Sequence, residues 1–212
     1  MVTLFPFAKG RIDMTTTFGG IPIVTPADDM PGPGQGHWTY EAYAAIPDDG
    51  RCYEIVDGVL FMTPSPSGWH QKAAGRIFHY LLTHIEDAGL GQVFIAPLDV
   101  ELTPKDVVQP DVFVLLNASG EKFIGSRIVG APDLVVEVAS PGTEDYDRYE
   151  KRDAYAHAGV PEYWVVDTMA RTVGVLVLEG GKYRSLGVFE GQATLPSKVV
   201  PEFPIRVEQF FV

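Results

Sequence analysis

The sequence contains a single cysteine, Cys52, among 212 residues. One cysteine excludes an internal disulfide framework and any zinc or iron–sulfur site built from several cysteines. The N-terminus also lacks the cationic segment, the long apolar segment and the small-residue cleavage site of a secretory signal. Both absences are typical of a protein of the reducing cytoplasm, and we expect a cytoplasmic location.

Basic residues are scarce as well, because 16 lysines and arginines stand against 28 acidic residues, for a net charge of −12. This balance excludes a surface that coats nucleic acid without specificity, so any contact with a polyanion must be local. No apolar stretch approaches the ~18 residues of a membrane span, and we expect no membrane partner. A hydrophobic content of 46% and this length fit one globular domain with a sizeable core.

Glycine and proline are concentrated near the N-terminus, most densely in the segment 31–36 with the sequence PGPGQG. This composition resists the interiors of both helices and strands. We therefore expect residues 1–37 to form a tail and residues 38–212 to form the domain. An alternative for the tail is an arm that packs on a partner subunit, because Leu4-Phe5-Pro6-Phe7 is apolar.

Within the domain, apolar periodicity and turn residues predict helices and strands in a clear order. The predicted elements are a short helix at 40–45, a hairpin at 53–62 around Asp57-Gly58, a helix at 70–88, strands at 92–102, 112–116 and 134–138, a helix at 145–158, a strand at 163–166 and a closing hairpin at 172–188. This order predicts a mixed α/β fold, with a central mixed β-sheet flanked by helices and a β-hairpin toward each end of the domain.

Two acidic residues stand at the ends of apolar strands, where their burial has to be offset by a metal, a proton or a cationic partner. Asp111 precedes the apolar segment 112–116, and Glu137 lies within the apolar segment 134–139. If the two strands are neighbours, both carboxylates can converge on a hard divalent cation, which prefers oxygen ligands. Taken singly, each acid is better explained as a strand-end acid that is solvated or caps a turn, whereas the two acids together favour the cation site.

The next predicted helix carries Asp147, Lys151 and Tyr155 at a spacing of four residues, so they share one helix face. A lysine on this face can reach the cation site and stabilise negative charge on a phosphate. The alternative is a surface ion pair between Asp147 and Lys151, which contributes little to stability.

Several blocks of sequence resemble, in the same order, the Uma family of restriction endonucleases, which belongs to the PD-(D/E)XK nuclease superfamily. They are Gln109-Pro110-Asp111, the segment 132–141 (PDLVVEVASP), the segment 147–151 and the segment 155–167 (YAHAGVPEYWVVD), preceded by the segments 47–58 and 64–70. The resemblance covers about residues 38–212, and the number of ordered blocks makes it specific.

The resemblance implies a restriction endonuclease-like core with a Mg²⁺-dependent site, in which Mn²⁺ is a possible substitute. Asp111 matches the aspartate of the PD element and Glu137 the acid of the (D/E)XK element, both as metal ligands. The superfamily's lysine normally follows this acid by two residues, but here that position is Ala139. In many Uma-type sequences the lysine stands on the next helix instead, and Lys151 is the matching residue.

The resemblance adds two further candidates for the catalytic site. Glu54 matches an early glutamate of the family and is either a third acid of the site or a hairpin acid facing solvent. His70 matches a histidine at the start of the long helix and either contacts the phosphate or the nucleophilic water, or makes a structural hydrogen bond. Asp99 is a weaker candidate. The other histidines show no metal-ligand spacing and are expected to be structural.

The resulting hypothesis is a Mg²⁺-dependent endonuclease that hydrolyses phosphodiester bonds of DNA. The alternative is a binding or regulatory protein that keeps the nuclease fold without turnover. The net charge favours this alternative, since duplex binding draws much of its affinity from neutralised phosphates, whereas the presence of Asp111, Glu137 and Lys151 together favours the enzyme. We also expect a homodimer, because nucleases of this superfamily commonly pair two sites.

Overall fold

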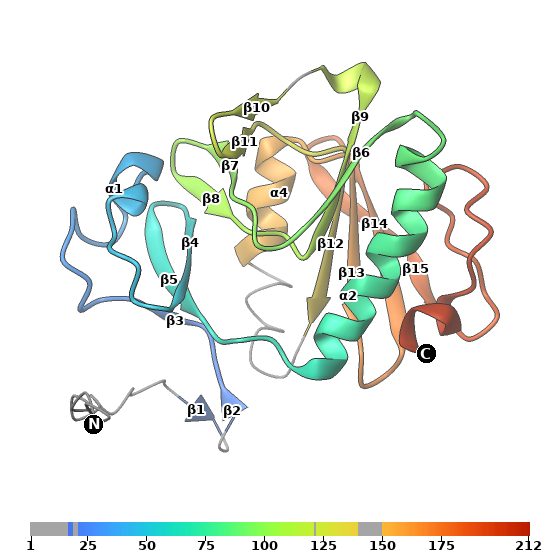
Figure 1. Ribbon diagram of the computed structural model, residues 1–212, viewed down its shortest axis with the longest axis horizontal. Helices are drawn as coiled ribbons and strands as arrows, with labels where there is room; N and C mark the ends of the chain where they lie inside the picture. The colour runs from blue at the N-terminus through green and yellow to red at the C-terminus, as the bar shows by residue number, and fades with distance from the viewer. Residues whose placement is uncertain (1–16, 19–20, 121, 140–149) are drawn as a thin grey trace, which may run out of the picture.

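The computed structural model describes residues 17–18, 21–120, 122–139 and 150–212. Two mixed β-sheets dominate the described part of the chain (Figure 1). The six-stranded sheet has the order β15 (Lys182–Glu190), β14 (Thr172–Glu179), β13 (Glu162–Asp167), β12 (Leu134–Ala139), β9 (Val112–Leu116) and β6 (Gly91–Ile95). The seven-stranded sheet has the order β10 (Phe123–Ile124), β11 (Arg127–Val129), β7 (Val100–Thr103), β8 (Asp106–Val108), β4 (Cys52–Val56), β5 (Val59–Thr63) and β3 (Thr25–Pro26).

The remaining elements are short apart from one helix. They are the pair β1 (Thr17–Phe18) and β2 (Ile21–Pro22), helix α1 (Tyr40–Ala44), helix α2 (Gly68–Leu81) continued by the π-helix η1 (Leu82–Glu86), the 3₁₀-helix η2 (Asn117–Ser119), helix α4 (Arg152–Ala158) and the 3₁₀-helix η4 (Val207–Phe211). No helix within the described ranges is long and apolar enough to cross a membrane.

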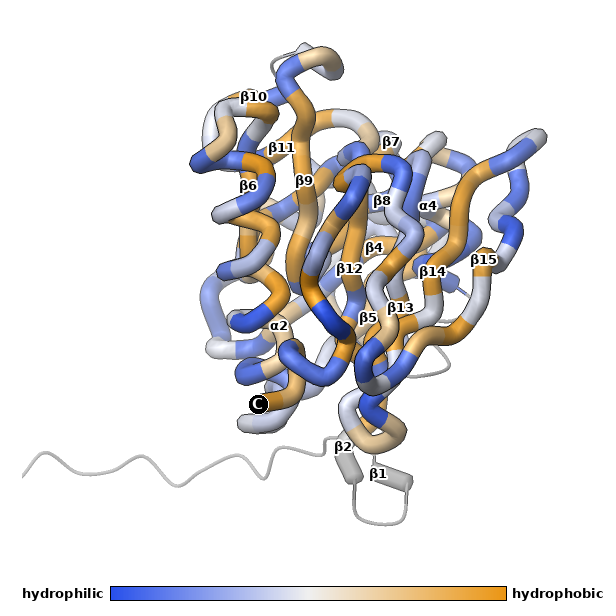
Figure 2. Tube along the Cα trace, turned by 90° about the vertical axis from the view of Figure 1, so that its right-hand side faces the viewer, coloured by the Kyte–Doolittle hydropathy of each residue, from blue (hydrophilic) through white to orange (hydrophobic). Residues whose placement is uncertain are grey.

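The six-stranded sheet is covered on both faces, as Figures 1 and 2 show from two directions. On one face, Ala73, Ile77 and Leu81 of α2 pack with alternate residues of β9 and β12 and with Phe210 of η4. On the other face, a second cluster joins the opposite side chains of these strands to α4 and to β7 and β8 of the seven-stranded sheet. The central strands are therefore apolar on both sides, which Figure 2 shows for β9.

β12 confirms the predicted central strand, because all six of its residues are buried. Leu134, Val136 and Val138 belong to the cluster beneath α2, whereas Val135 belongs to the cluster beneath α4. Since side chains alternate along a strand, Glu137 shares the face of Val135 and points toward the seven-stranded sheet. This alternation sends one carboxylate into the space between the two sheets.

The strand expected over residues 92–102 is wrong, since two strands in different sheets occupy this segment. β6 ends at Ile95 and pairs with β9, whereas β7 begins at Val100 and pairs with β8 and β11. Pro97 lies between them and has no N–H to continue a ladder, so the chain leaves one sheet and enters the other there. The second sheet is thus a feature that the sequence did not predict.

The two helices that border the site agree with the expected positions. α2 and η1 together span residues 68–86, close to the expected helix at 70–88, and Ser67 caps α2 by accepting a hydrogen bond from the His70 N–H. The expected helix at 145–158 ends as predicted, with Gly159 in the left-handed conformation. Its first part, with Asp147, lies outside the described residues.

Part of the N-terminal segment 1–37 contributes to the seven-stranded sheet. Thr25 and Pro26 pair with Met62 and Phe61 of β5. Trp38, just beyond the segment, is 1% exposed and packs against this hairpin. The apolar segment 4–7 lies outside the described residues.

Candidate active site

The pairing of β9 with β12 brings Asp111 and Glu137 together. The antiparallel register pairs Val112 with Val136, so Asp111 and Glu137 occupy the next position of the ladder. The Val138 N–H donates to Asp111 Oδ2 at 2.8 Å, and the Asp111 N–H lies 3.4 Å from Glu137 Oε2. The two strand-end acids are therefore neighbours where these two strands meet at one end of the sheet.

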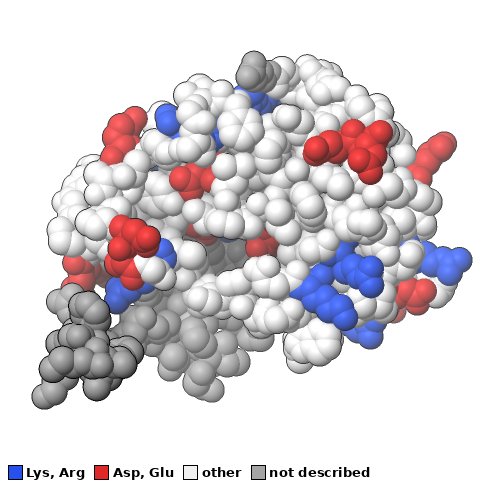
Figure 3. All heavy atoms as spheres, viewed as in Figure 1, with Lys and Arg blue, Asp and Glu red and all other residues white. Residues whose placement is uncertain are grey.

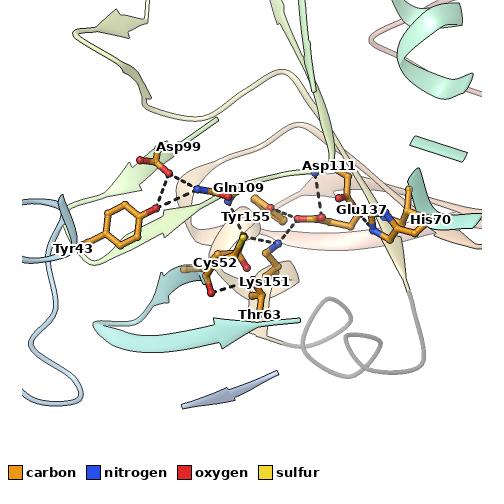
Figure 4. Close-up of polar contacts among 12 residues, drawn as sticks. Tyr43, Cys52, Thr63, His70, Asp99, Gln109, Asp111, Glu137, Lys151 and Tyr155 are labelled. Atoms are coloured by element: carbon orange, nitrogen blue, oxygen red, sulfur yellow. Dashed lines mark hydrogen bonds and ion pairs between the residues drawn. The ribbon is translucent and has the colours of Figure 1, made fainter. Parts of the chain in front are cut away.

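Lys151 lies between two buried carboxylates (Figure 4). Its Nζ is 2.8 Å from Glu137 Oε1 and 2.9 Å from Glu54 Oε1. All three side chains are at most 5% exposed. Glu54 comes from β4 of the seven-stranded sheet and Glu137 from the six-stranded sheet, so the ammonium group of Lys151 connects the two sheets electrostatically.

His70 meets the same group of acids from the first turn of α2. Its Nε2 is 3.0 Å from Asp111 Oδ2, and its side chain is 9% exposed. The other ring nitrogen, Nδ1, is buried and has no hydrogen-bond partner within the described residues. The imidazole thus lines the site, and its Nε2 is paired with Asp111.

Tyr155, one turn beyond Lys151 on α4, donates a hydrogen bond to Glu137 Oε1 at 2.5 Å. Burial raises the pKa of the Tyr155 phenol well above its usual value, and the nearby Glu137 carboxylate raises it further. Tyr155 therefore stays protonated and serves as a hydrogen-bond donor that fixes the orientation of Glu137.

A second layer of hydrogen bonds fixes Glu54. Its Oε1 accepts the Gln109 backbone N–H at 2.7 Å. The Gln109 side chain donates to Asp99 Oδ1 at 2.8 Å and to the Tyr43 hydroxyl at 3.2 Å, and that hydroxyl donates to Asp99 at 3.0 Å. Asp99, the weaker sequence candidate, thus helps to fix the position of Gln109 and does not line the site.

These acids open onto a cleft of about 290 Å³ between the two sheets and the start of α2. Glu54, Asp111 and Glu137 line it, and Lys151 is its one lysine or arginine among the described residues. Cys52 also lines the cleft, and burial together with the adjacent Glu54 raises the pKa of its thiol, which keeps it protonated.

The side chains of the cleft fit a divalent cation with a preference for oxygen. Three carboxylates line the cleft with one ammonium group, Lys151, and one imidazole, His70, which leaves an excess of negative charge in a partly buried space. Asp111 Oδ1 makes no hydrogen bond or ion pair within the described ranges, so it is available as a ligand. No group of three or more His, Cys, Asp or Glu side chains that could hold a metal occurs among the described residues. Two carboxylates completed by waters and phosphate oxygens suit Mg²⁺, which rarely has an all-protein cage.

The five catalytic candidates, without the weaker candidate Asp99, line this one cleft: Glu54, His70, Asp111, Glu137 and Lys151. Of the alternatives left open, Glu54 faces the site and not solvent, and Lys151 pairs with buried acids. Sequence reasoning assigned no site role to Tyr155 or Gln109. The spacing of Lys151 and Tyr155 on one helix face was the available signal for Tyr155.

The comparisons with known proteins concern the family and the fold. Residues 40–208 match the model of the Uma2 family, described as "Putative restriction endonuclease". The fold is similar to the crystal structure of "a putative nuclease belonging to DUF820" from Anabaena variabilis, with a TM-score of 0.66 and 19% identity over 82% of this chain and 97% of that one.

A curated relative, the uncharacterized protein slr1290 of Synechocystis sp., is 30% identical over 106 residues, which are 50% of this chain. The match covers 54% of that relative, so the chain spans about half of its length. The solved structure supports the fold, and the family model covers both strand-end acids together with Glu54, His70 and Lys151. The chain therefore belongs to the Uma2 family, whose description reads "Putative restriction endonuclease".

Proposed function

We propose that this protein is a Mg²⁺-dependent endonuclease that hydrolyses phosphodiester bonds of DNA. Family membership and the structural relative support a nuclease. The observation that carries the proposal is the convergence of Asp111, Glu137 and Lys151, from three separate segments, on one cleft. Carboxylates beside an ammonium group are suited to bind a cation and to stabilise the charge that develops on a phosphoryl group.

In this proposal Asp111 and Glu137 hold the cation. Bound Mg²⁺, or Mn²⁺ in its place, would neutralise phosphate charge and lower the pKa of a water molecule. The Lys151 ammonium, which Glu54 and Glu137 hold in place, stabilises negative charge on the phosphoryl oxygens. The imidazole of His70, which lies next to Asp111, accepts or donates a proton during the hydrolysis.

The charge of the cleft makes substrate binding dependent on the cation. Without it, Asp111 and Glu137 repel an incoming phosphate. We expect Mg²⁺ or Mn²⁺ to support both binding and cleavage. Ca²⁺ has longer oxygen bonds and looser coordination, and we expect it to support binding with little cleavage.

The test is a cleavage assay on single-stranded and duplex DNA and on RNA, with each cation and with EDTA. Glu137→Gln keeps the shape of the side chain but removes a negative ligand, so cleavage is expected to fall at least about tenfold in a folded protein. Glu190→Gln, an exposed glutamate at the end of β15, is the matched control. Equal cleavage by the parent and Glu137→Gln contradicts the metal site. Absence of cleavage from both folded proteins on every substrate favours the binding-protein alternative.

The oligomeric state and the location belong to the same proposal. A homodimer is part of the proposal because nucleases of this superfamily commonly pair two sites. Light scattering at micromolar concentration is expected to give twice the monomer mass, and a monomer contradicts it. A cytoplasmic location is consistent with a DNA substrate and with the single free cysteine, Cys52.

A further inference from the structure

A second cleft, of about 270 Å³, lies on the other side of the first turn of α2. Its walls come from α2, from the turn between β13 and β14, and from the C-terminal 3₁₀-helix. The residues that line it are Ser67, Trp69, Lys72, Ala73, Thr168, Met169, Arg171 and Phe211. None of them takes part in the proposed chemistry.

This cleft adjoins the candidate active site. His70 and Gln71 line the active-site cleft, while their neighbours Trp69 and Lys72 line the second one. The sheet register gives the same result, because β12 and β13 are parallel and Asp167 pairs with Ala139, two residues beyond Glu137. The turn after Asp167 therefore lies at the same end of the strands as Glu137, next to the carboxyl end of β12.

Trp69 is exposed to an unusual degree for a tryptophan. It is 68% exposed, whereas Trp38 and Trp164, the other two tryptophans of the chain, are 1% and 0% exposed. Met169 in the facing turn is 80% exposed. A large flat aromatic surface beside a cleft is a stacking platform for a nucleobase.

Two cations line the same cleft, one over the Trp69 ring and one over the Phe211 ring. Lys72 Nζ lies 5.9 Å from the centre of the Trp69 ring, and Arg171 Cζ lies 5.7 Å from the centre of the Phe211 ring. Figure 3 shows basic side chains gathered over the region of α2 and the C-terminus, on a face otherwise poor in them. In a chain with a net charge of −12, a local basic cluster next to an acidic site matches a polyanion that has to reach that site.

We propose that this second cleft binds an unstacked nucleotide of the substrate strand next to the scissile phosphate, with its base on Trp69 and its phosphate between Lys72 and Arg171. This inference rests on the proposed nuclease function and makes it more specific, because a base can stack on Trp69 only when it is outside a duplex stack. The preferred substrate is therefore single-stranded DNA, or a duplex with an unpaired segment at the site.

The test uses the full-length protein with a fluorescein-labelled single-stranded oligothymidylate in Ca²⁺, which is expected to support binding with little cleavage. Because Trp69 is the exposed tryptophan, binding is expected to quench the intrinsic fluorescence of the parent. Trp69→Ala is expected to weaken binding at least about fivefold by fluorescence anisotropy, the scale of one base–aromatic stack. Trp69→Phe is expected to keep most of the affinity and to lose the quenching.

The two cations are tested through the salt dependence of binding. Lys72→Ala and Arg171→Ala are each expected to lower the slope of log K against log salt by ~0.7, the value for one lost phosphate contact on a single strand. Lys182→Ala is the matched control, because Lys182 is an exposed lysine at the opposite end of β14 from Arg171. A change in fold stability alone would not alter this slope selectively.

The outcomes separate this inference from the proposed function. If the Trp69, Lys72 and Arg171 variants keep the affinity and the salt slope of the parent, and cleavage still depends on Glu137, the second cleft does not bind a nucleotide. The proposed nuclease function is then unaffected. Trp69-dependent quenching by a protein that cleaves nothing supports the cleft and contradicts the nuclease. Equal, equally Trp69-dependent binding of a fully paired duplex overturns the single-strand assignment. Variants that change only the mass in light scattering identify the cleft as a contact between copies of the chain and overturn the proposal.

Discussion

The Lys151 ammonium lies 2.8 Å from Glu137 Oε1, although the two residues belong to different elements and both are buried. In the superfamily pattern the lysine stands on the same strand as the acid, two residues later. Here that position, Ala139, carries no charge, and the start of α4 supplies the lysine. The same charge thus reaches the site from another segment.

Lys151→Met is expected to destabilise the fold strongly. Removal of the Lys151 ammonium leaves the two buried carboxylates of Glu54 and Glu137 without their positively charged partner. Breaking a buried ion pair in this way costs ~3–5 kcal/mol. The measurement is the free energy of unfolding in urea. The double variant Lys151→Met/Glu54→Gln is expected to recover part of the loss, because it also removes a buried negative charge. Lys182→Met is the exposed control, and an equal effect at Lys182 contradicts the prediction.

His70→Gln is expected to lower the cleavage rate at least about tenfold while the protein remains folded. Glutamine cannot accept or donate a proton beside Asp111 as the imidazole does. His79→Gln, on the exposed side of the same helix, is expected to cleave like the parent. Circular dichroism checks the fold of both variants. Equal cleavage rates in the two variants would show that His70 is structural.

Glu162 is expected to be essential for stability and not for chemistry. It is 0% exposed, and its two oxygens accept the Trp164 indole N–H at 2.7 Å, the Lys198 N–H at 2.7 Å and the Val199 N–H at 3.3 Å. Glu162→Ala leaves these donors without their acceptor, and we expect a loss of at least ~2 kcal/mol in the free energy of unfolding. Glu190→Ala, at an exposed strand end, serves as control. A thermal unfolding midpoint equal to that of the parent would disprove this role.

The pKa of Glu179 is expected to be about 2 in the folded protein, because Arg184 donates two hydrogen bonds to its carboxylate, with a smaller contribution from Lys198. A folded-state pKa below the usual 4.5 means that this ion pair contributes stability above that pH and loses it as the pH falls toward 2. The pair is exposed, so its effect on stability is small. Titration by NMR is expected to give a larger increase in the pKa for Arg184→Gln than for Lys198→Gln. The reverse order would contradict the hydrogen-bond assignment.

Local sequence signals determined the elements that carry the site. The apolar run of β12, interrupted only by Glu137, has few alternatives to a central strand, and Gly159 ends α4 because glycine readily adopts the left-handed conformation. Family-specific blocks then identified Asp111, Glu137, Lys151, Glu54 and His70 as site residues. Their position in one cleft agrees with that identification, and their catalytic roles remain predictions.

The tertiary structure decided what these residues contact. The register that places Asp111 beside Glu137, and the second sheet that brings Glu54 to Lys151, both depend on strand pairing between distant segments. A pattern along the chain specifies which face of a strand is apolar, but not which strand lies next to it. The second cleft follows the same rule, because Trp69 and Arg171 line one cleft only after α2 packs on a face of the six-stranded sheet.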